Sequence, residues 1–206
     1  QYQSIFGQNQ TSWNVAKGNF WGNATDSMAV SIDTTISGKS YKKILFYDLR
    51  YLPNPLSSPI GFVREDTVSG LAYYFSSLDT LEKLIYDLSL NVNDSFKVEG
   101  TWNSNPGYYH VDSIWIFNAR KHIRLNAYIN PNFGSTNEKL ILIEGICSNI
   151  GIAYQDNFYI DNFPYLFCSY KDNIQEYQNS HPTYYQKCSY PLSINEINNK
   201  TVKVYP

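Results

Sequence analysis

Residues 32–46 read Ile-Asp-Thr-Thr-Ile-Ser-Gly-Lys-Ser-Tyr-Lys-Lys-Ile-Leu-Phe, and this stretch decides the fold class. Ser37, Gly38 and Lys39 have the composition of a tight turn, because serine and glycine favour turn conformations. The residues on either side are rich in β-branched and aromatic side chains, which favour strands. The stretch therefore predicts two antiparallel strands joined in a hairpin.

The same pattern recurs along the chain. Residues 62–65 and 71–75 flank the turn-like residues 66–70, and a period of two is commoner than a period of 3.6. Residues 84–90 predict another strand, although residues 78–88 also fit one face of a helix. We expect an all-β protein with little helix, folded as an antiparallel sandwich or an open barrel.

Two parts of the chain resemble each other at a constant offset of 79 residues. They are about residues 32–75 and 111–154, and they predict two similar halves within one domain of residues 1–192. Residues 193–206 are a polar linker that could add an edge strand. The matching positions are Ile32-Asp33-Thr34 with Val111-Asp112-Ser113, Lys42-Lys43-Ile44 with Lys121-His122-Ile123, and Glu65 with Glu144.

Composition excludes several classes of function. The chain has 206 residues, 16 Lys and Arg against 18 Asp and Glu, and a net charge of −2, so it lacks the basic field that attracts nucleic acid. No apolar run approaches the roughly 20 residues of a membrane helix. The three histidines do not stand at metal-ligand spacing, so no zinc site is predicted. No cofactor is predicted, and no residue is assigned a catalytic role.

Two acidic patterns are candidate sites. Glu65 and Glu144 occupy matching places in the two halves, and could act as an acid/base pair in glycan hydrolysis. Turn capping or pairing with a neighbouring base is the simpler interpretation. Asp156 and Asp161 offer oxygen ligands for a structural calcium ion, but they lack the spacing of an EF-hand.

Aromatic residues form the remaining candidate surface. They make up 17% of the chain, and adjacent tyrosines place one ring on each face of a strand. Exposed tyrosine and tryptophan suit sugar stacking or protein contact, whereas cross-strand support of the sheet is the alternative role. The candidate contact residues are Trp102, Tyr108, Trp115 and Tyr184.

Ser193–Pro206 runs from a polar linker into Val-Tyr-Pro, which resembles the junction before the sorting domain of the type IX secretion system. Further blocks, among them residues 62–67, 84–88 and 143–151, are similar to an uncharacterised family of secreted Bacteroidota proteins that carries this domain. The family usually has glycine where Cys147 and Asn93 stand. The resemblance implies a β architecture and a secreted, extracellular or cell-surface location.

The resemblance also implies O-glycosylation at Asp-Ser/Thr-apolar patterns, although ordinary turn chemistry explains such short patterns too. The candidate acceptors are Ser27, Thr67, Thr80 and Ser113. Gln1 and the single methionine, Met28, fit a chain from which a signal peptide has been removed.

Export has a consequence for the three cysteines, because disulfides persist outside the cell. Cys168 and Cys188 lie in late, loop-rich stretches, and we expect them to pair. Cys147 is then left as a buried free thiol or as an intermolecular link.

Together these observations favour a secreted, non-enzymatic structural or interaction protein. It would be an adhesin-like surface module or a subunit of an extracellular assembly, whose partner is another copy, a cell surface or a matrix. The alternative is a carbohydrate- or small-ligand-binding β domain. A glycan hydrolase that uses Glu65 and Glu144 comes third.

Overall fold

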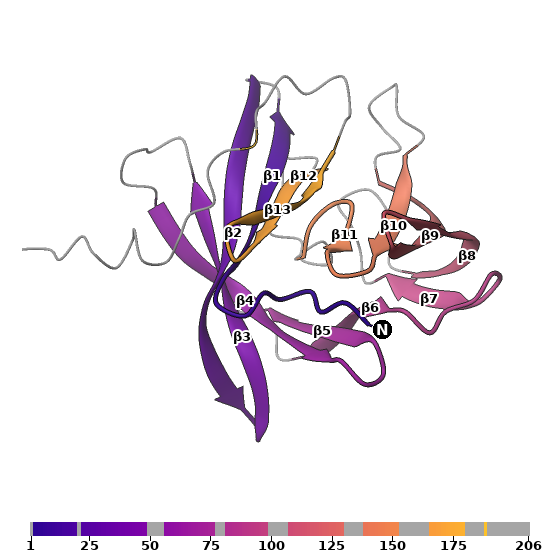
Figure 1. The fold of residues 1–206 in the computed structure, drawn as a ribbon, viewed down its shortest axis with the longest axis horizontal. Helices are drawn as coiled ribbons and strands as arrows, with labels where there is room; N and C mark the ends of the chain where they lie inside the picture. The colour runs from indigo at the N-terminus through magenta and orange to yellow at the C-terminus, as the bar shows by residue number, and fades with distance from the viewer. Residues whose placement is uncertain are drawn as a thin grey trace, which may run out of the picture.

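The computed structural model describes residues 2–19, 22–48, 56–76, 81–98, 107–129, 138–152, 165–179 and 188. Within these residues the chain forms β-strands and no helix (Figure 1). The strands make two curled antiparallel sheets, each shaped as half a barrel. The predicted all-β fold is therefore confirmed.

The larger sheet has eight strands in the order β13-β12-β1-β2-β3-β4-β5-β6. Within this order, the pairing of β12 with β1 is the one that joins strands far apart in the chain. Its strands are β1 (Thr11–Asn19), β2 (Gly22–Ile36), β3 (Lys39–Asp48), β4 (Leu56–Asp66), β5 (Leu71–Ser76), β6 (Glu82–Asp87), β12 (Tyr165–Lys171) and β13 (Ile174–Gln178).

The smaller sheet has five strands in the order β11-β10-β9-β8-β7. Its strands are β7 (Ser95–Val98), β8 (Gly107–Phe117), β9 (Arg120–Tyr128), β10 (Lys139–Ile143) and β11 (Cys147–Ser148). The long β8–β9 hairpin is the centre of this sheet, and it carries most of the side chains considered below.

The hairpin predicted at residues 32–46 is present. Strand β2 ends at Ile36, and β3 begins at Lys39. Ser37 and Gly38 connect them with φ angles of 50° and 78°, which is the left-handed conformation that such tight hairpin turns require. Within residues 78–88, for which a helix was the alternative, Glu82–Asp87 form strand β6, and residues 78–80 lie outside the described part of the chain.

The two stretches that match at an offset of 79 residues both form four-stranded meanders. The first contains β2 to β5 and belongs to the larger sheet, whereas the second contains β8 to β11 and belongs to the smaller sheet. Both opening hairpins have an irregular register, between Val30 and Asp33 in one and between Val111 and Ser113 in the other. Residues 193–206 lie outside the described part of the chain.

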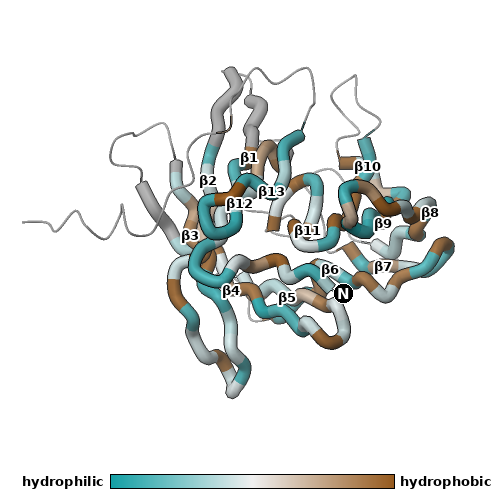
Figure 2. Tube along the Cα trace, viewed as in Figure 1, coloured by the Kyte–Doolittle hydropathy of each residue, from teal (hydrophilic) through white to brown (hydrophobic). Residues whose placement is uncertain are grey.

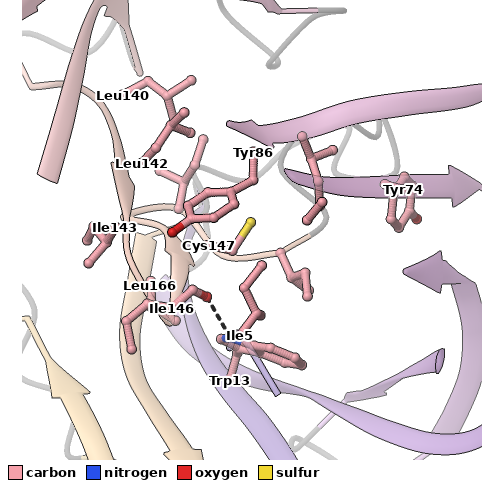
Figure 3. Close-up of a cluster of buried hydrophobic side chains, with 14 of the residues drawn as sticks. Ile5, Trp13, Tyr74, Tyr86, Leu140, Leu142, Ile143, Ile146, Cys147 and Leu166 are labelled. Atoms are coloured by element: carbon pink, nitrogen blue, oxygen red, sulfur yellow. Dashed lines mark hydrogen bonds between the residues drawn. The ribbon is translucent and has the colours of Figure 1, made fainter. Parts of the chain in front are cut away.

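A single hydrophobic core joins the two sheets. Hydrophobic and hydrophilic residues alternate along many strands, which gives each sheet one apolar face (Figure 2). In the core, Trp13 from the larger sheet donates a hydrogen bond from Nε1 to the carbonyl oxygen of Ile146, at 3.1 Å (Figure 3). Tyr86 from β6 lies close to Cys147 and Leu142 in the same view, so both sheets contribute to one packed cluster.

Candidate functional site

The two matching glutamates hold the first residues of the chain. Glu65 lies near the end of β4, and it accepts hydrogen bonds from the Tyr2 hydroxyl, from Ser4 Oγ at 2.5 Å and from the Ile5 amide at 2.7 Å. Glu144 follows β10, and it accepts one from the Gln3 amide at 3.1 Å. The leading segment, residues 2–10, is therefore held between one carboxylate from the larger sheet and one that follows a strand of the smaller sheet.

Other contacts fix the rest of the leading segment. The Lys171 ammonium group donates to the Ser4 carbonyl oxygen. Asp172, in the turn between β12 and β13, accepts from the amides of Gln8, Asn9 and Gln10 at 2.9, 2.7 and 3.0 Å. Ile5 itself is fully buried in the core. The segment is thus an integral part of the sandwich (Figure 1, the indigo trace that ends at N).

Burial changes the chemistry of the groups beneath this segment. Burial and the hydrogen bond to Glu65 raise the pKa of Tyr2 far above its usual range. Burial raises the pKa of Tyr86 and of Cys147 in the same way. These hydroxyl and thiol groups therefore stay protonated, and Glu65 and Glu144 serve as acceptors for backbone and hydroxyl donors.

Two hollows lie beside the leading segment. One has a volume of about 310 Å³ and is lined in part by Lys42 and Glu65, and the other has about 410 Å³ and is lined in part by Lys121 and Glu144. These are the residues that match at the offset of 79. Each of the two lysines is engaged, since Lys42 pairs with Asp33 at 2.9 Å and Lys121 donates to the carbonyl oxygens of Leu88 and Leu90.

An aromatic face lies on the opposite side of the smaller sheet from the core. The ring of Trp115 stacks on His122 with centroids 5.2 Å apart and an interplanar angle of 20°. The ring of Phe117 meets the same His122 edge-on at 6.1 Å. Because Ile123 and Leu125 point into the core, the residues that alternate with them on β9 point outward. We call the outward rings of Tyr108, Trp115, Phe117, His122 and Tyr128 the aromatic face.

His122 supports this face as a neutral ring. It is only 8% exposed, and its burial lowers its pKa. Its Nδ1 lies 3.1 Å from the carbonyl oxygen of Arg120, so Nδ1 carries the proton and donates to that oxygen. The ring therefore acts as a flat support beneath Trp115.

Charged side chains lie between the two ends of the aromatic face. Asp112 accepts from Arg124 Nε at 2.6 Å and from Lys139 Nζ at 2.6 Å. Partial burial opposes ionisation of Asp112, but the hydrogen bonds from Lys139 and Arg124 prevail and hold its pKa below its usual range. The Lys139 ammonium group also lies 5.7 Å from the centre of the Tyr128 ring. Because this group contains two cations and one carboxylate, its net charge is positive.

The predicted contact residues divide between described and undescribed parts of the chain. Trp115 and Tyr108 lie on the aromatic face, and Tyr108 is 70% exposed. Trp102 and Tyr184 lie outside the described residues, as do Asp156 and Asp161, the candidate calcium ligands. Among the residues that are described, no cluster of acidic, histidine or cysteine side chains could hold a metal ion.

The four candidate acceptors for a glycan lie in different surroundings. Ser27 is fully buried, and its hydroxyl has no hydrogen-bond partner among the described residues. Ser113 is half-buried and donates its hydroxyl to Asp112 at 3.0 Å. Thr67 is exposed in the β4–β5 turn, whereas Thr80 lies outside the described residues. Of the three that the structure describes, Thr67 is the one that is exposed.

The cysteines are arranged as the sequence predicts. Cys168 and Cys188 form a disulfide, with their Cα atoms 5.8 Å apart. Cys147 is a free, fully buried thiol. An intermolecular link through Cys147 would require the core to open, so the buried-thiol interpretation fits its surroundings better.

Sequence reasoning did not identify His122, Phe117, Asp112, Arg124 and Lys139 as members of one surface. A signal was available, because Asn118 and Ala119 form a two-residue turn that sets Trp115 opposite His122. The irregular register at Val111 and Ser113 then brings Asp112 beside Arg124, and such a bulge is not visible in the sequence.

No family model, curated protein or solved structure matches the chain. No helix in the described ranges has the length and apolar character that crossing a membrane would require.

Proposed function

We propose that this protein is an extracellular interaction module of the adhesin type, which binds its partner through the outer side of the β8–β9 hairpin. The proposal rests on the distribution of large apolar side chains that are exposed to solvent. Of nine such side chains among the described residues, three lie on the outer side of this hairpin, namely Tyr108, Phe117 and Tyr128. A fourth, Ile116, pairs with Lys121 and points to the other side of the sheet.

Exposed apolar side chains that gather on one surface of a water-soluble domain usually mark a contact site. Phe117 is 60% exposed at the end of the hairpin, and Tyr108 is 70% exposed toward its other end. The β-hairpin supports these side chains, and His122 contacts Trp115 by stacking and Phe117 edge-on. Such pre-ordered aromatic side chains lose little entropy on binding.

Three further features support an extracellular interaction role. The Cys168–Cys188 disulfide is compatible with an oxidising compartment. Glu65 and Glu144, the candidate acid/base pair, have a structural role, because they hold the leading segment. The tail resembles a sorting junction, which favours a cell-surface location.

A single substitution with a matched control tests the proposal. Phe117→Ser removes an exposed ring from the hairpin, and Ile174→Ser removes a side chain of similar exposure, 65%, from β13 in the other sheet. Binding to whole cells and to immobilised matrix, and self-association by light scattering, would be measured for both variants and for the unmodified protein. Circular dichroism would confirm that each variant is folded.

We expect Phe117→Ser to weaken binding at least about tenfold, which is the effect of losing one interface anchor, and Ile174→Ser to leave it unchanged. The proposal is overturned if the unmodified protein binds neither cells, matrix nor itself. Equal binding by the folded Phe117→Ser variant would overturn it as well.

A further inference from the structure

The outward residues of β9 form a row that can accommodate an extended ligand. His122, Arg124 and Tyr128 alternate with core residues, so all three point away from the core. A strand rises about 3.3 Å per residue, so the row from His122 to Tyr128 is roughly 20 Å long. A linear chain lying along β9 would meet rings at both ends and charge in the middle.

The rings at the two ends are available for stacking. Phe117 and Trp115 both contact His122 at one end. Tyr108 and Tyr128 lie toward the other end, where Tyr128 is 45% exposed. Flat aromatic surfaces suit the C–H faces of sugar rings, since both are rigid and apolar. The distance between the two ends favours a ligand of several linked units over a single small molecule.

The charged group in the middle favours an anion. The side chain of Arg124 is 43% exposed, and its Nε is already bound by Asp112. That contact orients the guanidinium group, while its two terminal nitrogens have no hydrogen-bond partner among the described residues. Two parallel N–H donors match the two oxygens of a carboxylate. Lys139 pairs with the same carboxylate, that of Asp112, and adds a second positive charge beside Arg124.

The local charge contrasts with that of the whole molecule. Arg124, Lys139 and Asp112 together carry one net positive charge, whereas the chain carries −2. A ligand with well-separated anionic groups fits this arrangement. Nucleic acid fits it less well, because binding a phosphate backbone generally needs a row of cations along the strand.

We propose that the ligand of the aromatic face is an acidic polysaccharide, a chain of sugars that carry carboxylate groups. One carboxylate pairs with Arg124 and is attracted by Lys139, while neighbouring sugar rings stack on Phe117 with Trp115 and on Tyr128 with Tyr108. Asp112 is a positioning residue, which holds both cations on the outer side of the sheet. This assignment rests on the proposed function, because it names the partner of the same surface.

The test uses the full chain and three probes: polygalacturonate, a neutral cellulose derivative and a single-stranded oligonucleotide. Binding would be measured by isothermal calorimetry and affinity electrophoresis at low and high salt. The variants are Arg124→Gln, Arg124→Lys and Lys42→Gln. Lys42 is the matched control, because it too pairs with an aspartate, Asp33, on a β-hairpin, but in the other sheet.

We expect polygalacturonate to bind and its affinity to fall as salt rises, with little binding of the neutral polymer. Arg124→Gln should weaken the affinity about tenfold or more, the effect of losing a charge-assisted hydrogen bond. Arg124→Lys should retain part of the affinity, and Lys42→Gln all of it. The fold of each variant would be checked by circular dichroism.

The inference is overturned if polygalacturonate does not bind, or if the folded Arg124→Gln variant binds it as the unmodified protein does. A nucleic-acid site would replace it if the oligonucleotide bound more tightly than polygalacturonate and Arg124→Gln abolished binding of the oligonucleotide. A third outcome separates the two proposals. If Phe117→Ser loses cell or matrix binding but the unmodified protein does not bind polygalacturonate, the proposed function is supported and the acidic polysaccharide is excluded as its ligand.

Discussion

At the scale of single residues, the structure assigns tasks to charged side chains that composition alone leaves open. Glu82 on β6 accepts two hydrogen bonds from Arg64, at 2.5 and 2.8 Å, and one from Tyr41 at 2.5 Å. Arg64 also stacks on Tyr73, with the guanidinium carbon 3.7 Å from the ring centre. This cluster ties four neighbouring strands together, because β3, β4, β5 and β6 each contribute one of its members.

The cluster predicts a stability loss in acid. The hydrogen bond from Arg64 lowers the pKa of Glu82 from 4.5 to about 2, so the stability that ionised Glu82 provides is complete above pH of about 4.5 and is lost as the pH falls toward 2. We expect the free energy of unfolding to fall less between pH 6 and pH 3 in Glu82→Gln than in the unmodified protein. Urea denaturation at both pH values measures this, and equal losses in the two proteins would contradict it.

At the scale of elements, three hairpins share one turn geometry. Ser37-Gly38, Asn118-Ala119 and Asp172-Asn173 each connect two strands with two residues, and all six residues have positive φ angles. Serine, asparagine, aspartate and glycine are common in tight turns of this kind, but alanine is not. Ala119, with φ of 58°, is the strained exception.

This exception predicts a stabilising substitution. Ala119→Gly should raise the free energy of unfolding by about 1 kcal/mol, because glycine adopts the left-handed conformation without the clash of a Cβ atom. Ala127→Gly is the control in the same strand pair, and it should lower stability, since Ala127 is buried in β9 and glycine is unfavourable inside a strand. Thermal and urea unfolding would measure both. A lower stability for Ala119→Gly would show that the turn is not strained.

At the scale of the whole molecule, the leading segment bridges the two sheets through Glu65 and Glu144. Glu65→Ala should therefore lower the free energy of unfolding by about 2 kcal/mol, because it leaves the Ile5 amide and the Tyr2 hydroxyl without their acceptor. Hydrogen exchange at the Ile5 amide should accelerate. Asp66→Ala, at the last residue of β4, is the control and should leave that exchange rate unchanged, because Asp66 accepts hydrogen bonds from Val68 and Ser69 of its own turn. Unaltered protection of Ile5 in Glu65→Ala would contradict the bridging role.

Local patterns could be predicted because their causes lie within a few residues. Ser37 and Gly38 predict their hairpin, since only neighbouring residues decide a two-residue turn. The tryptophan and tyrosine of the β8–β9 hairpin were likewise recognised as contact candidates. Their supporting residues, His122 and Arg124, were not, because the bulge in β8 that brings Asp112 to them depends on strand pairing.

Strand periodicity, turn chemistry and redox context act locally or through composition, so the fold class, the hairpin at residues 32–46 and the cysteine pair follow from the sequence. The roles of Glu65 and Glu144 depend instead on how the two sheets pack. Their matching positions indicate a pair, but the packing of one sheet on the other places residues 2–5 between them. The same packing leaves the outer side of β8 and β9 uncovered among the described residues, so aromatic side chains that elsewhere build the core form an exposed face here.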